Sequence, residues 1–418
     1  MKYYRFPDTV LYKIGFPLFL FLVQILARST AYANIAIGVE RSYILTMGLC
    51  AVFGMAFVVY NKRELRGILT DRRMLAVVLV TVIVLVPMLV KRDWQMMYFS
   101  VLLCLYLPIF LSYFTTLKET ARCYVLITAA FAAYSLIGLF LLKPLAQAGV
   151  LRANTFYSTG GWLMYDFGLT HSVILNNLGH PALRNFGIFR EPGLYQVFLF
   201  VAVLLNNEWA DWSKNWVRWA LNAVLMVTLV TTFATGGVLA LGLYFVFLFF
   251  DEGFYRKKWA VLGALAVCVA GIGIIAVALA QGGTWAYELV GMVEKVYNMS
   301  GSLTNRVDSI FENLSIFLRN PVFGERIATV LYAVEANTAS TMILFSIFGL
   351  AGGILHLASW AALLWKKDRP LVGTLALAAI TFITFNTQNT THDVYFWLFP
   401  MLALTERGLP LLNFRKKR

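Results

Sequence analysis

The sequence predicts an all-α protein that crosses a membrane about twelve times. Of its 418 residues, 60% are hydrophobic and only 13% are charged, and the mean hydropathy is +0.72. Soluble domains carry roughly 25% charged residues, so this composition indicates a polytopic membrane protein. The apolar runs are about as long as membrane-spanning helices and show no strict alternation, and a helix satisfies its own backbone groups in lipid.

Twelve apolar segments are the expected spans, and the first is expected to be retained rather than cleaved as a signal peptide. The last of them is short and contains Pro400. No internal repeat or low-complexity tract divides the chain, so residues 1–418 are expected to form a single integral membrane domain. The segments are 10–27, 42–60, 74–90, 96–116, 123–142, 193–207, 216–233, 235–251, 259–281, 338–364, 370–386 and 394–406.

The basic residues predict the orientation, because cytoplasmic loops carry an excess of Lys and Arg. Residues 61–73 (NKRELRGILTDRR) hold the densest basic group, and alternation from this loop also places 117–122, 251–258 and 366–369 inside, with both termini cytoplasmic. Lys91 and Arg92 are the exceptions, since they fall outside. The net charge of +14 therefore reflects the expected membrane orientation. It does not indicate nucleic-acid binding, because the sequence contains no nucleic-acid-binding motif.

Several classes of chemistry lack their motifs in this chain. Cys50, Cys104, Cys123 and Cys268 all fall in expected spans, so neither a disulfide framework nor a metal site is indicated. No phosphate-binding loop, dinucleotide fingerprint or nucleophile elbow occurs, and no cofactor is expected. Lys13 is the main ionisable residue within a span, whereas a coupled transporter should carry more of them.

The first of two long outer loops, 143–192, ends on charged residues just before a span. Pro192 suits the first turn of the following helix, and Glu191 would then stand at its N-terminus, where a carboxylate is stabilised by about 0.3–1 kcal/mol. Capping is therefore one interpretation of Glu191, and interfacial anchoring or loop ion pairs are the corresponding interpretation of the arginines. The candidates for binding or chemistry here are Arg152, His180, Arg184, Arg190 and Glu191.

The second long outer loop, 282–337, contains an expected amphipathic helix over 302–321. Its apolar residues recur at helical spacing, and Asn320-Pro321 should end it. Arg306 stands in the first turn, where the helix dipole disfavours a cation. Either a local carboxylate, Asp308 or Glu312, or an anionic ligand could compensate Arg306.

Three stretches in this order resemble the bacterial O-antigen and exopolysaccharide polymerases (Wzy-type), in the O-antigen ligase superfamily. LRNFGIFREPGLYQ (183–196) resembles their R-x-x-G-x-F-x-E-P element ahead of a span. SGSLTNRVDSIFENLSIFLRNPVFGE (300–325) is similar to their second-loop pattern, and ANTASTMILFSIFGLAGG (336–353) to the Asn-containing start of the next span. The twelve-span layout with two large outer loops fits as well.

The chain departs from this family pattern at two places. The related ligases carry a His just ahead of the second-loop Asn, but here the stretch is VEAN, with Glu335 at that point before Asn337. This favours polymerase over ligase. In TTFATGG (231–237), Gly236 or Gly237 replaces a Ser-Arg pair of many relatives, so an arginine role cannot be transferred there.

The resemblance implies a metal-independent, inverting glycosyl transfer at the outer face of the bacterial inner membrane. A glycan on undecaprenyl diphosphate would pass to the sugar hydroxyl of another lipid-linked repeat unit. Arg184 and Arg306 would hold the diphosphate, since guanidinium groups bind phosphate oxygens bidentately, and Glu191 would be the general base. The secondary candidates are Arg190 and Arg152 for the phosphates, Glu335 and His180 as bases, and Asn337 for substrate binding.

Other functions are open alternatives at this stage. An O-antigen ligase would differ only in using lipid A-core as the acceptor. A lipid or polysaccharide flippase would need a charged central cavity, and a scaffold role would leave the loop arginines unexplained. The polymerase reading also implies a chain-length regulator and a flippase as possible partners in the same membrane.

Overall fold

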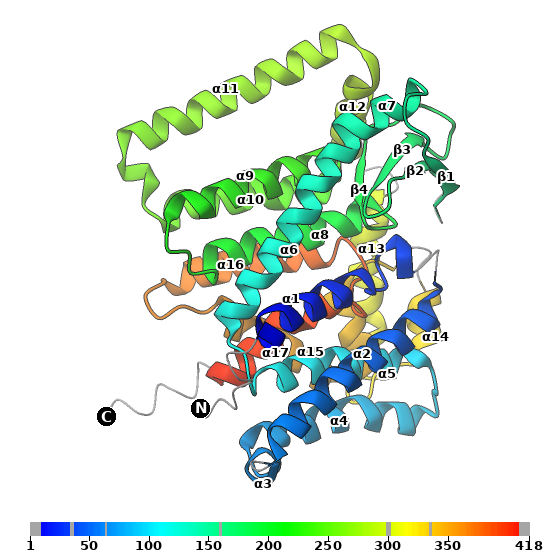
Figure 1. Cartoon of the computed structure of the whole chain (residues 1–418), viewed down its shortest axis with the longest axis vertical. Coiled ribbons are helices and arrows are strands. Elements are labelled where there is room, and N and C mark those ends of the chain that lie inside the picture. The colour runs from blue at the N-terminus through cyan, green and yellow to red at the C-terminus, as the bar shows by residue number, and fades with distance from the viewer. Residues whose placement is uncertain are drawn as a thin grey trace.

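The computed structural model describes residues 10–33, 37–62, 65–158, 161–297, 302–333 and 337–408. Most of these residues are helical, and Figure 1 shows many of the long helices crossing the molecule in broadly the same direction. Within the described residues, four helical stretches are long and apolar enough to cross a membrane: α2 (Val39–Tyr60), α4 (Arg72–Lys91), Leu117–Gln147 and α15 (Ser340–Leu364). These confirm a helical, membrane-embedded protein.

Every one of the twelve apolar segments contains a helix in the structure. Local sequence fixes several starting points: the side chain of Asp71 caps α4, and Thr116 with Glu119 forms a capping box at α6. The long stretch that begins with α6 (Leu117–Ile137) continues through η3 (Gly138–Leu142) and α7 (Lys143–Gln147), and two short elements are α3 (Leu65–Leu69) and η4 (Phe254–Arg256). The remaining helices of this set are α1 (Val10–Ile25), α5 (Met96–Leu111), α8 (Pro192–Glu208), α9 (Asn215–Thr231), α10 (Thr235–Asp251), α11 (Lys258–Gln281), α16 (Leu371–Phe385) and α17 (Val394–Arg407).

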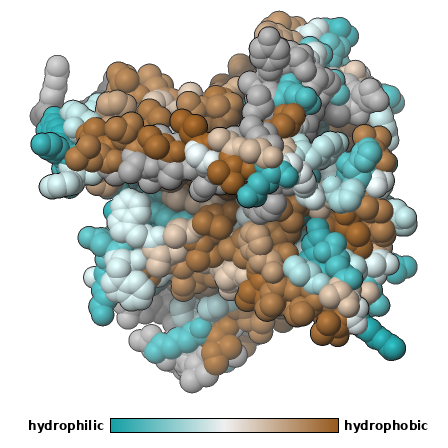
Figure 2. Space-filling model, turned by 90° about the horizontal axis from the view of Figure 1, so that it is seen from above, coloured by the Kyte–Doolittle hydropathy of each residue, from teal (hydrophilic) through white to brown (hydrophobic). Residues whose placement is uncertain are grey.

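The long loops lie at one end of the helix bundle and the shorter connections at the other. In Figure 1 the two long loops lie at the right, while α3 and the turn from α10 to α11 lie toward the left. Figure 2, a view from above, shows apolar side chains over the broad middle of that face and hydrophilic residues mainly toward its left and right edges. This distribution is typical of a protein whose middle lies in lipid.

The first long loop contains a β-sheet, so the all-α prediction is wrong for this segment. Four short strands form an antiparallel sheet in chain order: β1 (Asn154–Tyr157), β2 (Leu163–Asp166), β3 (His171–Leu175) and β4 (Asn185–Gly187). Aromatic and β-branched residues alternate with glycine turns here, and Gly161 and Gly168 have φ of 77° and 82°. A small core of Met164, Val173, Ala182 and Phe186 stabilises the sheet.

The second long loop is helical, as expected. It consists of α12 (Gly283–Tyr297), α13 (Ser302–Arg319) and α14 (Ile327–Tyr332), and α13 ends just before Asn320-Pro321. However, α13 packs on the bundle through Ser309, Asn313 and Ile316, which are buried. Its apolar stripe points outward instead, and the exposed members are Val307, Phe311, Leu314 and Leu318.

Lys91, the last residue of α4, and Asp93 bind the second loop to the bundle. The Lys91 ammonium donates to the carbonyls of Glu325 (2.9 Å) and Ile347 (2.5 Å). A carboxylate oxygen of Asp93 accepts from the backbone N–H of Ile327 at 2.8 Å. These contacts give Lys91 a structural role at this end of α4, which can account for a basic residue that departs from the expected charge pattern.

A break in the helix α15 provides further contacts between the second loop and the bundle. Gly349 has φ 65° and ψ −161°, a conformation open to glycine, and a Cβ there would collide with the carbonyl of Val322. The Leu350 N–H donates to Pro321 O (2.8 Å), and the Glu325 N–H to Ser346 O (2.6 Å). The segment after α13 thus supplies partners to the interrupted helix.

Candidate functional site

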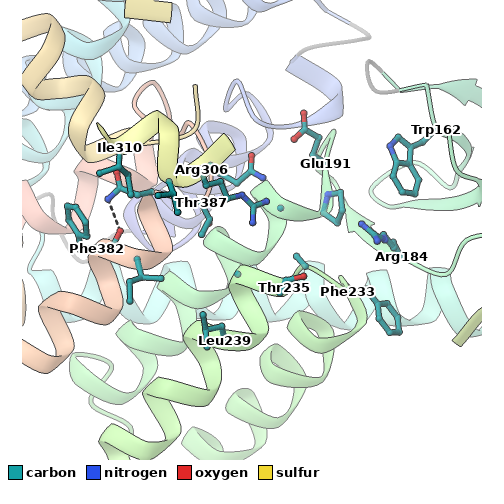
Figure 3. Close-up of a pocket in the computed structure, with 18 residues that line it drawn as sticks. Trp162, Arg184, Glu191, Phe233, Thr235, Leu239, Arg306, Ile310, Phe382 and Thr387 are labelled. Carbon is teal, nitrogen blue, oxygen red and sulfur yellow. Dashed lines mark hydrogen bonds between the residues drawn. The ribbon is translucent and has the colours of Figure 1, made fainter. Parts of the chain in front are cut away.

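A cavity of about 440 Å³ lies where the two long loops meet the helix ends. Ligand sites usually have volumes of about 300–1,000 Å³, so this cavity is large enough for a headgroup or a sugar. Its lining comes from the N-terminal ends of α8 and α10, the first turns of α13, the last turns of α16 and Trp162 of the sheet (Figure 3). The cavity brings together Arg184, Glu191 and Arg306, which are the three residues predicted to act on the substrate.

Glu191 is the N-cap residue of α8, but its carboxylate does not cap the helix. The backbone of Glu191 is extended (φ −145°, ψ 143°), Pro192 occupies the first turn, and no side-chain capping bond forms. The side chain is half-buried and lines the cavity. Glu191 therefore stands at the N-terminus of α8 as expected, but no capping hydrogen bond occupies its carboxylate, which is available to a ligand.

Arg306 lies in a partly buried position at the α13 side of the cavity. Burial lowers the pKa of its guanidinium, and the nearby Glu191 carboxylate acts in the opposite direction. Asp308 and Glu312, its possible local partners, are both exposed, and no carboxylate of the described residues lies within salt-bridge distance of Arg306. A guanidinium that burial penalises and no ion pair compensates is suited to an incoming anion.

Arg184 does have a partner, which sequence reasoning missed. Its Nε lies 2.7 Å from a carboxylate oxygen of Glu288 on α12, whose side chain is only 2% exposed. The guanidinium also stands over the Trp162 ring at 5.2 Å from the ring centre (Figure 3). The bond uses Nε alone, and within the described chain no hydrogen bond occupies the two Nη groups.

Two helix N-termini also point at the cavity. Glu191, Pro192 and Gly193 begin α8, while Ala234, Thr235 and Gly236 begin α10, and all six line the cavity. First-turn N–H groups have no partner within their own helix, and the helix dipole makes these ends positive. Together with two guanidiniums, they form an environment suited to a phosphate group.

The glycine pair in TTFATGG has a packing reason. A Cβ at Gly237 would collide with the side chain of Gln196, and one at Gly236 would come within 2.8 Å of the Thr387 side chain. Phe233, in the turn after α9, has a positive φ of 49°, and this turn leads the chain into α10. This stretch therefore contributes a helix end to the cavity.

The structure places the other predicted site residues outside the cavity lining. Arg152 is exposed, and His180 is exposed with its ring 6.1 Å from that of Tyr287. The Asn337 amide bonds within the second loop, accepting from Ser309 (2.9 Å) and Asn313 (2.8 Å) and donating to Val330 O (2.7 Å). Glu335 lies outside the described residues.

Arg190 belongs to a polar cluster next to the cavity, which sequence reasoning did not find. The buried Asp393 accepts from the Ser29 N–H at 3.1 Å, and the Arg190 N–H donates to Ser29 O at 3.1 Å. Burial raises the pKa of Asp393 to about 6, although hydrogen bonds from Ser29 and the charges of Arg28 and Arg190 lower it. The Nε atoms of both arginines are buried and lack hydrogen-bond partners in the described structure.

His392, the neighbour of Asp393, is also buried. Its Nδ1 lies 3.1 Å from the Ser100 hydroxyl, and burial together with Arg28 and Arg190 lowers its pKa well below the usual value. The ring is therefore neutral at physiological pH. In the described part of the chain, no group of three or more His, Cys, Asp or Glu side chains is arranged to hold a metal ion.

Comparisons of the chain with models of protein families, with curated proteins and with solved structures gave no match. The assignment of function therefore depends on the geometry of the cavity and on the motifs in the sequence.

Proposed function

We propose that this protein is a polysaccharide polymerase that transfers a glycan from undecaprenyl diphosphate onto a lipid-linked repeat unit. The observation that carries the proposal is the cavity whose lining includes Arg184, Arg306, Glu191 and two helix N-termini. A diphosphate leaving group needs cationic and N–H donors, and a sugar hydroxyl needs a base. Both are present within one cavity beside apolar helices.

The proposed reaction is a single displacement. The acceptor hydroxyl oxygen bonds to the anomeric carbon of the donor while the bond from that carbon to the diphosphate oxygen breaks. Glu191 accepts the hydroxyl proton, and Arg184 and Arg306 stabilise the charge that develops on the departing undecaprenyl diphosphate. One displacement inverts the anomeric centre.

The proposal includes twelve spans, cytoplasmic termini and a cavity on the periplasmic side of the bacterial inner membrane. The basic residues support this orientation, because the 65–73 and 251–258 segments belong to the end of the molecule opposite the cavity. At that outer end, the cavity can reach sugars in the periplasm.

The test compares glycan chain length in cells that make Arg184→Ala, Arg306→Ala or Glu191→Gln at matched membrane levels. Losing one such donor typically lowers turnover by about 10²–10³-fold, so we expect single repeats on the lipid and no long chains. Arg319→Ala is the matched control, since Arg319 is exposed on the same helix as Arg306 and far along it. Wild-type chain lengths in all three variants would refute the proposed site.

A second measurement separates polymerase from ligase. Purified protein receives the lipid-linked donor with either a second lipid-linked repeat or lipid A-core as acceptor. Longer lipid-linked chains with the first acceptor support the polymerase, and transfer to lipid A-core alone would make the protein a ligase.

A further inference from the structure

A second cavity, of about 420 Å³, runs as a groove along α15 and α16. It extends from Thr341 and Phe385 at one end of these helices to Leu364 and Leu371 at the other. Because α16 has 15 residues, the groove is roughly 22 Å long. That length covers most of the hydrocarbon thickness of a bilayer, which is about 30 Å.

The groove adjoins the charged cavity. Phe382 lines both, and its neighbour Ile383 lines the charged cavity while Phe385 lines the groove. Phe382 and Ile383 are exposed, as is Leu239 on the facing side of the charged cavity. A lipid whose headgroup lies beside Arg306 can therefore lay its chain past Phe382 into the groove.

The groove is long and narrow. Its volume of about 420 Å³ extends along roughly 22 Å of helix, a shape that suits an extended hydrocarbon chain. Three alanines, Ala358, Ala361 and Ala378, belong to its lining, and larger side chains at these positions would fill it.

The lining of the groove is mainly apolar and aromatic, which suits a hydrocarbon chain. His356, Trp360 and Thr374 belong to it, but Nδ1 of His356, Nε1 of Trp360 and Oγ1 of Thr374 are themselves buried, so these residues present their apolar parts to the groove. The His356 ring is fixed by stacking on Phe396 at 4.7 Å.

We infer that the groove between α15 and α16 binds the polyisoprenyl chain of the lipid whose diphosphate occupies the charged cavity. This inference rests on the proposed function, because it assigns the tail of the same substrate. Binding energy from this remote part of the lipid would position the diphosphate against Arg184 and Arg306.

The test fills the groove and changes the length of the lipid chain. Ala378→Phe narrows the groove, and Ala379→Phe is the matched control, because Ala379 is exposed on the same helix and does not line the groove. Transfer is measured with an undecaprenyl donor and with a geranyl donor that carries the same glycan. We expect Ala378→Phe to raise KM for the undecaprenyl donor about tenfold, which is about 1.4 kcal/mol, and to leave KM for the geranyl donor unchanged.

The outcomes separate the two proposals. An unchanged KM for both donors in an active Ala378→Phe variant overturns the groove assignment and leaves the proposed function standing. No transfer by the wild type with either donor overturns the proposed function itself. Ala361→Phe is the second groove variant should Ala378→Phe fail to fold, and cross-linking from a photoreactive undecaprenyl phosphate to α15 or α16 supplies a readout that is independent of turnover. Equal cross-linking of wild type and groove variants would also count against the groove.

Discussion

Arginines at the two ends of this molecule have opposite surroundings. At the end away from the long loops, the Arg369 guanidinium is saturated with partners. It forms ion pairs with Glu208 at 3.0 Å and Asp251 at 2.8 Å, and it donates a hydrogen bond to Leu364 O at 3.3 Å. Lys366 adds a further contact to Glu208 at 2.8 Å. At the opposite end, Arg306 is largely buried but has no ion-pair partner among the described carboxylates.

The contrast distinguishes structural charges from charges kept for a ligand. A buried guanidinium with full partners holds elements together, here the ends of α8 and α10 and the turn between α15 and α16. A buried guanidinium without partners has lost water and gained nothing in return, which costs free energy in the empty protein. Such a cost is retained at sites where a ligand supplies the missing partner.

The largest expected effect on stability comes from removing the ion pairs of Arg369. Arg369→Ala should lower the free energy of unfolding by about 3–5 kcal/mol, because Glu208 and Asp251 lose their shared buried partner. Arg306→Ala should leave stability nearly unchanged and instead abolish chain growth. Thermal unfolding of the two purified variants in detergent measures the difference.

Lys367→Ala is the control for this comparison, since Lys367 is exposed two residues before Arg369. A destabilisation of Arg306→Ala as large as that of Arg369→Ala would show that both arginines are structural. The contrast between the two ends would then have no functional meaning.

A pH-dependent effect is expected from the cluster beside the cavity. The pKa of Asp393 is raised from 3.8 to about 6, chiefly by burial, so the folded protein keeps a proton that the unfolded chain releases between those values. This contribution to stability is full below pH 4 and is lost as the pH rises through about 6, a change of roughly 3 kcal/mol. Arg28 and Arg190 oppose the shift, and Tyr395 lies near the same carboxylate with its hydroxyl 3.4 Å away.

Asp393→Asn removes the titrating group and tests the assignment. The melting temperature of the wild type should fall between pH 4 and 6.5 relative to that of the variant, and the two curves should run parallel above pH 7. Parallel curves over the whole range would mean that Asp393 is charged throughout. The shift would then belong to other groups.

The sequence predicted the parts of this molecule that depend on local pattern. Apolar runs of the length of a span identified twelve helices, and the spacing over 302–321 identified α13, because both signals lie within one element. The helix α12, in the second loop, was not predicted. The sheet was missed because its strands have only three to five residues, although aromatic residues between glycines were a readable signal.

Partners from distant parts of the chain could not be predicted in this way. Arg184 meets Glu288 across 104 positions, and Ser29 meets Asp393 across 364. Periodicity predicted α13 but not which of its faces packs inward, which the hydrogen bonds of the buried Ser309 and Asn313 show. The motif resemblance predicted that Arg184, Glu191 and Arg306 act on the same substrate, and in the structure all three line one cavity.

The smallest expected effect is on ligand affinity and concerns the two arginines of the cavity. Arg184 forms an ion pair there, whereas Arg306 has no ion-pair partner among the described carboxylates. Glu288→Gln keeps a hydrogen-bond acceptor for Arg184 but removes the negative charge, so the guanidinium should bind a diphosphate more strongly. We expect up to about a tenfold gain in affinity for undecaprenyl diphosphate, measured by titration of the purified protein, and slower turnover because this product leaves more slowly. Glu294→Gln, on the exposed side of the same helix, is the control. Weaker binding in Glu288→Gln would mean that the carboxylate is needed to hold Arg184 in place, and the pair would then resemble the saturated network around Arg369.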